Sequence, residues 1–183
     1  MTDAEADMLD RAAAAALALA GERAWTQVTL RDIAAKAGVP LAELYARAPS
    51  KRAVIDWLSR RFDLAALKNG HDDDPHDRLF EAAMRRLEAM EPHRSALISV
   101  YGGEGPGPLL LRLPHTARAL LEGAGIDTSG KRGAVRVAAM TLVWTRILSV
   151  WRADEGALNR TMAEIDRRLK EMRERLRRVG AGY

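Results

Sequence analysis

The sequence predicts an all-α protein of about nine helices, and three observations support this fold class. Apolar residues recur every three or four positions through most of the 183-residue chain. Capping residues and turn formers punctuate these stretches. No segment alternates apolar and polar residues long enough to make a convincing strand. We expect a helix-turn-helix domain over residues 1–67, followed by a helical ligand-binding and dimerisation domain over residues 68–183.

The first four helices are predicted over residues 8–23, 30–37, 40–46 and 51–67. The first is rich in alanine, the best helix former. Thr29 can cap the second helix, and Gly38 offers the left-handed conformation that ends it. Pro40 suits the first turn of the third helix, and Ser50 can cap the fourth. Two short helices joined by a tight glycine turn are typical of a helix-turn-helix unit.

The later helices follow a stretch rich in turn formers, residues 68–77, where we place the domain boundary. The sequence GGEGPGP, residues 102–108, has too much glycine and proline for a helix, so we expect an exposed loop there. Pro114 can kink the helix that follows this loop. Further helices are predicted over residues 79–90, 109–125 and 131–153, and from about Gly156 onward.

The composition describes a soluble globular protein, with 48% hydrophobic and 30% charged residues and a net charge of +4. Residues 1–68 carry ten basic against nine acidic side chains, whereas residues 160–183 carry eight against four. The basic excess therefore lies outside the helix-turn-helix segment, which argues against strong non-specific DNA binding by one copy. No run is long and apolar enough for stable membrane insertion, and the acidic start lacks the basic region of a signal peptide, so we expect a cytoplasmic protein.

The residues around the predicted turn follow a specific order. Trp25 precedes TLRDIAAKAGV, which is followed by LY and then by PSK. This order resembles the N-terminal domain of the TetR (tetracycline-repressor-like) family over roughly residues 8–62. The resemblance implies a homodimer that binds double-stranded operator DNA. It implies phosphate contacts from Thr29, Arg31, Tyr45 and Lys51, and base contacts from Pro40, Leu41, Ala42, Glu43 and Arg47.

The third helix departs from the family pattern where base contacts are expected. Relatives usually place hydroxyl, basic or polar residues and glycine where this chain has Pro40, Leu41 and Ala42. Hydrogen-bond donors are therefore scarce, although Leu41 can meet a thymine methyl and Glu43 can accept from cytosine. Ala48 replaces the usual aromatic residue before PSK. Because the phosphate positions are intact, DNA binding and a retained scaffold without DNA binding both stay open.

Two apolar patterns characterise the C-terminal domain. The first is a broad interior with soft walls, made by Phe80, Met84, Leu87, Met140, Trp144, Ile147 and Trp151. It is either an ordinary core or a cavity for a hydrophobic small molecule or lipid.

The second pattern is a seam spaced four and three residues apart, made by Leu158, Met162, Ile165, Leu169, Met172 and Leu176. This seam can either pack within its own domain or form a homodimer interface, and binding to a membrane surface is a third, less favoured alternative. Residues 148–172 also resemble the final helices of the TetR-like lipid-binding accessory proteins of coenzyme Q biosynthesis, through W-x-x-D, T-M and D-R-R-L. That resemblance implies an alternative function, isoprenoid binding after loss of DNA binding.

No motif indicates catalysis or a cofactor, so we expect neither an enzyme nor a bound cofactor. His71, Asp74 and His76 are a candidate metal site, but aspartates beside a proline more often form a solvated linker. The leading hypothesis is a TetR-like regulator, a repressor, released by a hydrophobic effector. The effector would favour a dimer whose two third helices no longer lie one DNA turn, about 34 Å, apart.

Overall fold

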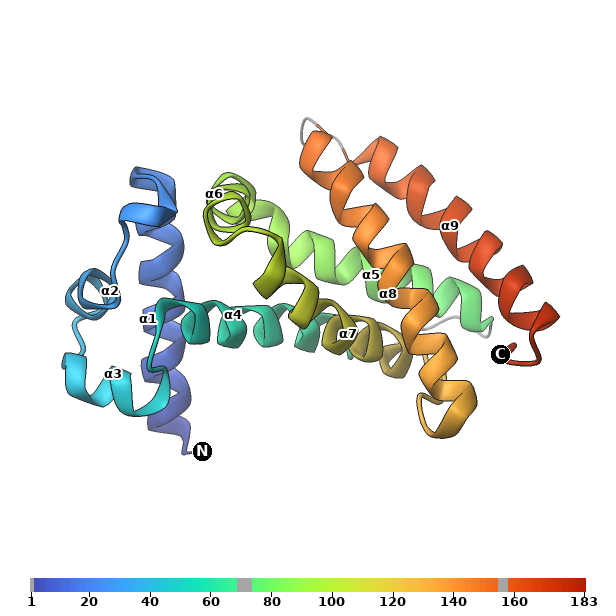
Figure 1. Ribbon diagram of the computed structural model, residues 1–183, viewed down its shortest axis with the longest axis horizontal. Helices are drawn as coiled ribbons and strands as arrows, with labels where there is room; N and C mark the ends of the chain where they lie inside the picture. The colour runs from blue at the N-terminus through green and yellow to red at the C-terminus, as the bar shows by residue number, and fades with distance from the viewer. Residues whose placement is uncertain (1, 69–73, 155–157) are drawn as a thin grey trace. The chain divides into compact units, whose positions relative to one another are not determined.

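The computed structural model describes residues 2–68, 74–154 and 158–183 (Figure 1). Over these residues it contains nine α-helices, two 3-10 turns and no strand, so the all-α prediction is confirmed. The chain forms two compact units. The first comprises Met1–Arg61 and His93–Leu110, and the second comprises Phe62–Pro92 and Leu111–Tyr183.

The first unit is built around an alanine-rich helix. It contains α1 (Asp3–Glu22), η1 (Trp25–Gln27), α2 (Leu30–Ala37), α3 (Leu41–Arg47), most of α4 (Lys51–Ala66) and α6 (Arg94–Glu104). Ala12 and Ala16 are fully buried, and α1 packs against α2, α3 and α6. Small side chains on α1 let these helices approach closely.

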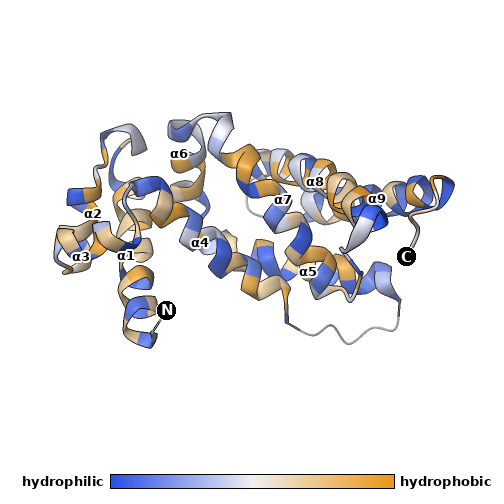
Figure 2. Ribbon diagram, turned by 60° about the horizontal axis from the view of Figure 1, so that its bottom comes forward, coloured by the Kyte–Doolittle hydropathy of each residue, from blue (hydrophilic) through white to orange (hydrophobic). Residues whose placement is uncertain are grey.

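The second unit buries the larger side chains. It contains α5 (Pro75–Met90), most of α7 (Pro106–Gly123), α8 (Gly130–Ala153) and α9 (Asn159–Arg178). A 3-10 turn, η2 (Glu91–His93), follows α5 directly. α9 packs against α5 and α8, and Trp144 and Trp151 of α8 are fully buried. Hydrophobic and hydrophilic residues alternate along each helix (Figure 2), as expected when one side of a helix is buried.

The capping predictions for the first unit are confirmed. Thr29 caps α2, and Gly38 ends it with φ of 65°. Ser50 Oγ accepts a hydrogen bond from Ala53 N at 3.1 Å, so it caps α4.

The predicted exposed loop over residues 102–108 is wrong, because α6 and α7 together cover most of this stretch. Only Gly105, with φ of 73°, separates the two helices. A Cβ on Gly103 would lie 2.9 Å from Trp25 Cβ, so the contact between α6 and η1 requires glycine there. Tertiary packing thus overrides the low helix propensity of these glycines. Pro114 lies inside α7 without ending it.

One described helix, α8, is long and apolar enough by length and composition to cross a membrane. The core helix of a soluble protein meets the same criterion, and eight residues of α8 are buried in the second unit. The last helix begins at Asn159 in the described residues, and the predicted start near Gly156 lies outside them.

Candidate nucleic-acid interface

The entry to α2 is fixed by reciprocal hydrogen bonds between Thr29 and Asp32. Asp32 N donates to Thr29 Oγ1 at 3.2 Å, while Asp32 Oδ2 accepts from Thr29 N at 2.9 Å and from Thr29 Oγ1 at 2.7 Å. These bonds lower the pKa of Asp32, and Arg23 adds to the effect. The Thr29 hydroxyl, a predicted phosphate contact, is therefore engaged in the cap, although the residue is exposed.

The turn after α2 depends on the left-handed conformation of Gly38. Val39 N donates to Ala34 O at 3.0 Å, and Gly38 N donates to Ala35 O at 3.2 Å, so the last carbonyls of α2 are satisfied. Val39 is buried, and α3 begins directly after Pro40. The arrangement α2, glycine turn, α3 is that of a helix-turn-helix unit.

The exposed side of α3 carries two methyl groups. Leu44 is fully buried, so residues two positions away on either side point outward at 100° per residue. These are Ala42 and Ala46, both exposed. Glu43 and Tyr45 lie on the two flanks, and Tyr45 is 59% exposed. The outermost surface of α3 is therefore suited to apolar contact with thymine methyls rather than to hydrogen bonds.

Most cations near this surface are paired inside the first unit. The ion pairs join Arg23 to Asp32 (2.9 Å), Lys36 to Glu22 (2.6 Å), Arg61 to Asp10 (3.1 Å) and Arg47 to Glu5. Arg31 differs, because its exposed side chain forms no hydrogen bond or ion pair among the described residues. Of the predicted phosphate contacts, Arg31 is thus the one whose charge is most available to DNA.

Lys51 has a structural role that sequence reasoning missed. Its ammonium donates to the carbonyl oxygens of Trp25 (2.7 Å) and Val28 (2.8 Å) and lies 4.9 Å from the centre of the Trp25 ring. Burial lowers the pKa of Lys51, and the nearby Glu104 carboxylate opposes that shift. Lys51 therefore connects the start of α4, through hydrogen bonds, to the segment before α2. One of its three N–H donors is left over, and a phosphate contact from Lys51 stays a prediction.

The residues predicted to bind a ligand are gathered in the second unit. Leu87, Met140, Trp144, Ile147 and Trp151 are fully buried, whereas Phe80 and Met84 are partly exposed. Neither the pocket between α8 and α9 nor the groove near α3, both described below, is lined by these side chains. They pack as an interior, and a ligand cavity among them stays a prediction.

This interior contains a buried ion pair that sequence reasoning also missed. Arg86 is 3% exposed, and its Nε donates to Asp63 Oδ1 at 2.8 Å. Thr116 Oγ1 donates to the same oxygen at 3.0 Å and accepts from Arg86 Nη2 at 3.2 Å. The guanidinium lies 5.1 Å from the centre of the Trp144 ring. Removing one partner of such a pair costs roughly 3–5 kcal/mol, because the other charge is left buried.

The predicted dimer seam on α9 needs correction at four of its six positions. Ile165, Leu169, Met172 and Leu176 are at most 3% exposed, because α5 and α8 cover them within the same chain. The alternative interpretation, packing within the domain, holds for these four. Met162 is 40% exposed and Leu158 is partly exposed, so a dimer contact from these two stays a prediction.

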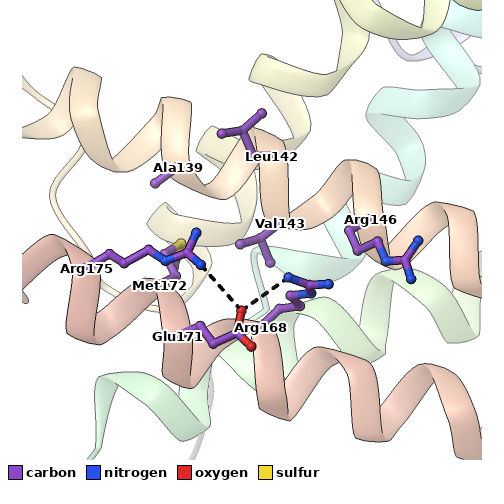
Figure 3. Close-up of a pocket in the computed structure, with 8 residues that line it drawn as sticks. All are labelled: Ala139, Leu142, Val143, Arg146, Arg168, Glu171, Met172 and Arg175. Atoms are coloured by element: carbon purple, nitrogen blue, oxygen red, sulfur yellow. Dashed lines mark hydrogen bonds and ion pairs between the residues drawn. The ribbon is translucent and has the colours of Figure 1, made fainter.

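An apolar surface is instead left open on α8. Val135 and Leu142, two turns apart on one face, are 43% and 74% exposed. Beside Leu142, a pocket of about 190 Å³ runs between α8 and α9 (Figure 3). Glu171 lines the pocket between Arg168 and Arg175, with N···O distances of 3.2 and 3.9 Å. The lining from α8 is apolar except for Arg146, and the lining from α9 is charged except for Met172.

Of the three residues of the candidate metal site, Asp74 and His76 are described, and His71 lies outside the described residues. Asp74 caps α5 by accepting from His76 N at 2.8 Å, and it pairs with Arg173 at 3.2 Å. In the part of the chain that the structure describes, no three His, Cys, Asp or Glu side chains converge as metal ligands do.

Comparisons with known proteins bear on the first unit and on the whole fold. Residues 13–56 match the family model for bacterial regulatory proteins of the tetR family. The chain is similar to the crystal structure of a TetR transcriptional regulator from Rhodococcus sp. RHA1, with a TM-score of 0.68 and 17% identity over 91% of this chain and 95% of that one.

A transcriptional regulator from Rhodococcus sp. Rha1 gives a TM-score of 0.52, also at 17% identity, over 91% of this chain and 96% of that one. No match was found among curated protein sequences. The two structures establish a shared fold, and the resemblance to coenzyme Q accessory proteins gains no support from these comparisons.

Proposed function

We propose that this chain, which carries a TetR-family N-terminal domain on the fold of TetR regulators, is a homodimeric repressor released from operator DNA by a hydrophobic effector. The observation that carries the proposal is the geometry around Gly38. A capped α2, a left-handed glycine and a short α3 with one side exposed are the parts that a helix-turn-helix needs to enter a major groove.

The surface around α3 supports a mode of DNA binding that uses few unpaired positive charges. Arg31 supplies an available cation, and Tyr45 an exposed hydroxyl, on the two sides of the turn. Phosphate contacts of this kind orient the protein, while Leu41, Ala42 and Glu43 would contact base edges. Because most other cations are paired within the chain, we expect weak non-specific affinity and a shallow dependence on salt.

A homodimer is supported by the exposed stripe on α8. Val135 and Leu142 leave apolar surface that two copies can bury against each other, and Met162 of α9 is a further exposed apolar side chain. Two copies are required because one recognition helix reads one half-site, and the half-sites lie about 34 Å apart. Replacing Leu142 with arginine should convert a dimer into a monomer in light scattering, while arginine at the exposed Glu88 of α5 should not.

An effector site is supported by the interior of the second unit. Met140 and Met84 have flexible side chains, which let a core repack around an apolar guest. Trp144 is fully buried in this interior and stacks on the Arg86 guanidinium, so an apolar molecule entering there should change tryptophan fluorescence. The effector acts if it binds the DNA-releasing conformation of the dimer more tightly than the DNA-bound one. Such a protein works in the cytoplasm, where operator DNA lies.

The decisive experiment is a mobility shift with promoter DNA from the protein's own locus at about 50 mM salt, where counterion release favours binding. A shift that a hydrophobic compound reverses supports the whole proposal. No shift, together with lipid co-purifying in native mass spectrometry, would overturn it in favour of lipid binding without DNA.

A further inference from the structure

Arg47, the basic residue of α3, is held by a carboxylate of α1. Arg47 Nε donates to Glu5 Oε1 at 2.9 Å, and Arg47 Nη2 donates to the same oxygen. The other oxygen, Glu5 Oε2, accepts from Thr2 N at 2.9 Å as part of the α1 capping box. Glu5 thus connects the start of α1 to the end of the predicted recognition helix, and the hydrogen bonds from Thr2 and Arg47 lower its pKa.

Arg47 occupies the flank of α3 that a base-reading or phosphate-binding cation would use. It lies one turn after Glu43, on the same side of the helix, and close to the exposed face formed by Ala42 and Ala46. Its side chain is 48% exposed, and that of Glu5 is 26% exposed. The pair is therefore accessible to solvent, and a DNA phosphate can compete with Glu5 for the guanidinium.

The pair lines an open groove formed by α1, the end of α3 and α4. Ala48 lines this groove, and its small, buried side chain leaves the space open beside Arg47. Asp56 and Arg60 of α4 are the other charged residues of the groove. With Glu5 and Arg47 they make two acidic and two basic side chains, so the groove as a whole has no charge that attracts DNA.

We propose that Glu5 is a positioning residue that withholds Arg47 from DNA and thereby limits the affinity of this chain for duplexes. The inference rests on the proposed function, since it concerns the same DNA complex. An Arg47 bound to Glu5 cannot neutralise a phosphate, so one counterion fewer is released on binding. Because exposed ion pairs are weak, releasing Arg47 should strengthen binding about two- to five-fold.

The test uses Glu5→Gln, which removes the charge but keeps an amide oxygen for the capping hydrogen bond from Thr2. The probe is a generic duplex, followed by fluorescence anisotropy between about 50 and 200 mM salt. We expect about two- to five-fold tighter binding, and a plot of log K against log salt that is steeper by about 0.9. Asp3→Asn, a matched control, removes an exposed carboxylate from the same helical turn and should leave the slope unchanged.

An Arg47→Ala background separates the proposed contact from a general charge effect. There, Glu5→Gln should no longer change either affinity or slope. An equal gain in both backgrounds would overturn the inference, because it would mean that only the net charge matters. If wild-type protein binds DNA and Glu5→Gln leaves its affinity unchanged, the inference fails while the proposed function stands. If no variant binds any duplex at about 50 mM salt, both fail.

Discussion

Gly38→Ala tests whether the left-handed glycine holds the helix-turn-helix together. An L-residue with φ near 65° costs roughly 1–2 kcal/mol, and a Cβ at this position meets no atom within 4 Å, so no clash adds to that cost. Alanine also has less conformational freedom than glycine in the unfolded chain, and this difference stabilises the folded state by about 0.4–1 kcal/mol. We therefore expect Gly38→Ala to destabilise the protein by about 1 kcal/mol, or to lower its Tm by about 2–4 °C.

Two further substitutions turn this into an ordered series. Gly38→Asn should lie between wild type and Gly38→Ala, because asparagine tolerates the left-handed conformation better. Gly102→Ala serves as the matched control in the same unit: Gly102 is helical, and its Cβ would also meet nothing within 4 Å. It should stabilise by about 0.5–1 kcal/mol.

The assay is urea unfolding followed by circular dichroism at fixed protein concentration. The two alanine variants should differ by about 2 kcal/mol in free energy of unfolding, with opposite signs relative to wild type. A Gly38→Ala protein as stable as wild type would refute the reasoning, because it would show that residue 38 need not be left-handed.

Three further predictions concern charge. Arg31→Ala should weaken binding to all duplexes alike and reduce the salt slope by about 0.9, as measured by anisotropy; a change in sequence preference instead would contradict a phosphate contact. Lys51→Met should cost about 2 kcal/mol in urea unfolding, because it removes two charged hydrogen bonds to the Trp25 and Val28 carbonyls; an unchanged midpoint would show that these bonds contribute nothing. Burial of Glu164 opposes its ionisation, but hydrogen bonds from two arginines of α9 outweigh burial and lower its pKa from 4.5 to about 2. Its contribution, about 3 kcal/mol, is therefore complete above pH 4.5 and lost as the pH falls through 2, and Glu164→Gln should flatten acid unfolding in that window.

The sequence alone determined the fold class and the ends of the first helices. Thr29, Gly38 and Ser50 were identified from their residue types and spacing, and each acts where predicted. Their effects depend on partners within four residues along the chain, so a linear pattern contains the whole interaction.

Burial on α9 was predicted in part. The spacing of Ile165, Leu169, Met172 and Leu176 correctly marked the buried side of a helix. Which surface covers that side depends on the placement of α5 and α8, which the spacing does not contain. The apolar surface that a second copy could cover is instead at Val135 and Leu142, and no periodic pattern in the sequence predicted their exposure.

Only the tertiary structure decided the contacts between distant segments. Gly103 looks like a loop residue until Trp25 is placed against α6. Likewise, Arg47 looks like a free cation of a recognition helix until Glu5 lies beside it, and Arg86 looks like a surface charge until Asp63 is buried against it. The physical reason is the separation of the interacting residues along the chain. Caps and helical faces depend on neighbours in sequence. The charge that a side chain presents to DNA depends instead on which distant partner the fold brings within hydrogen-bonding distance.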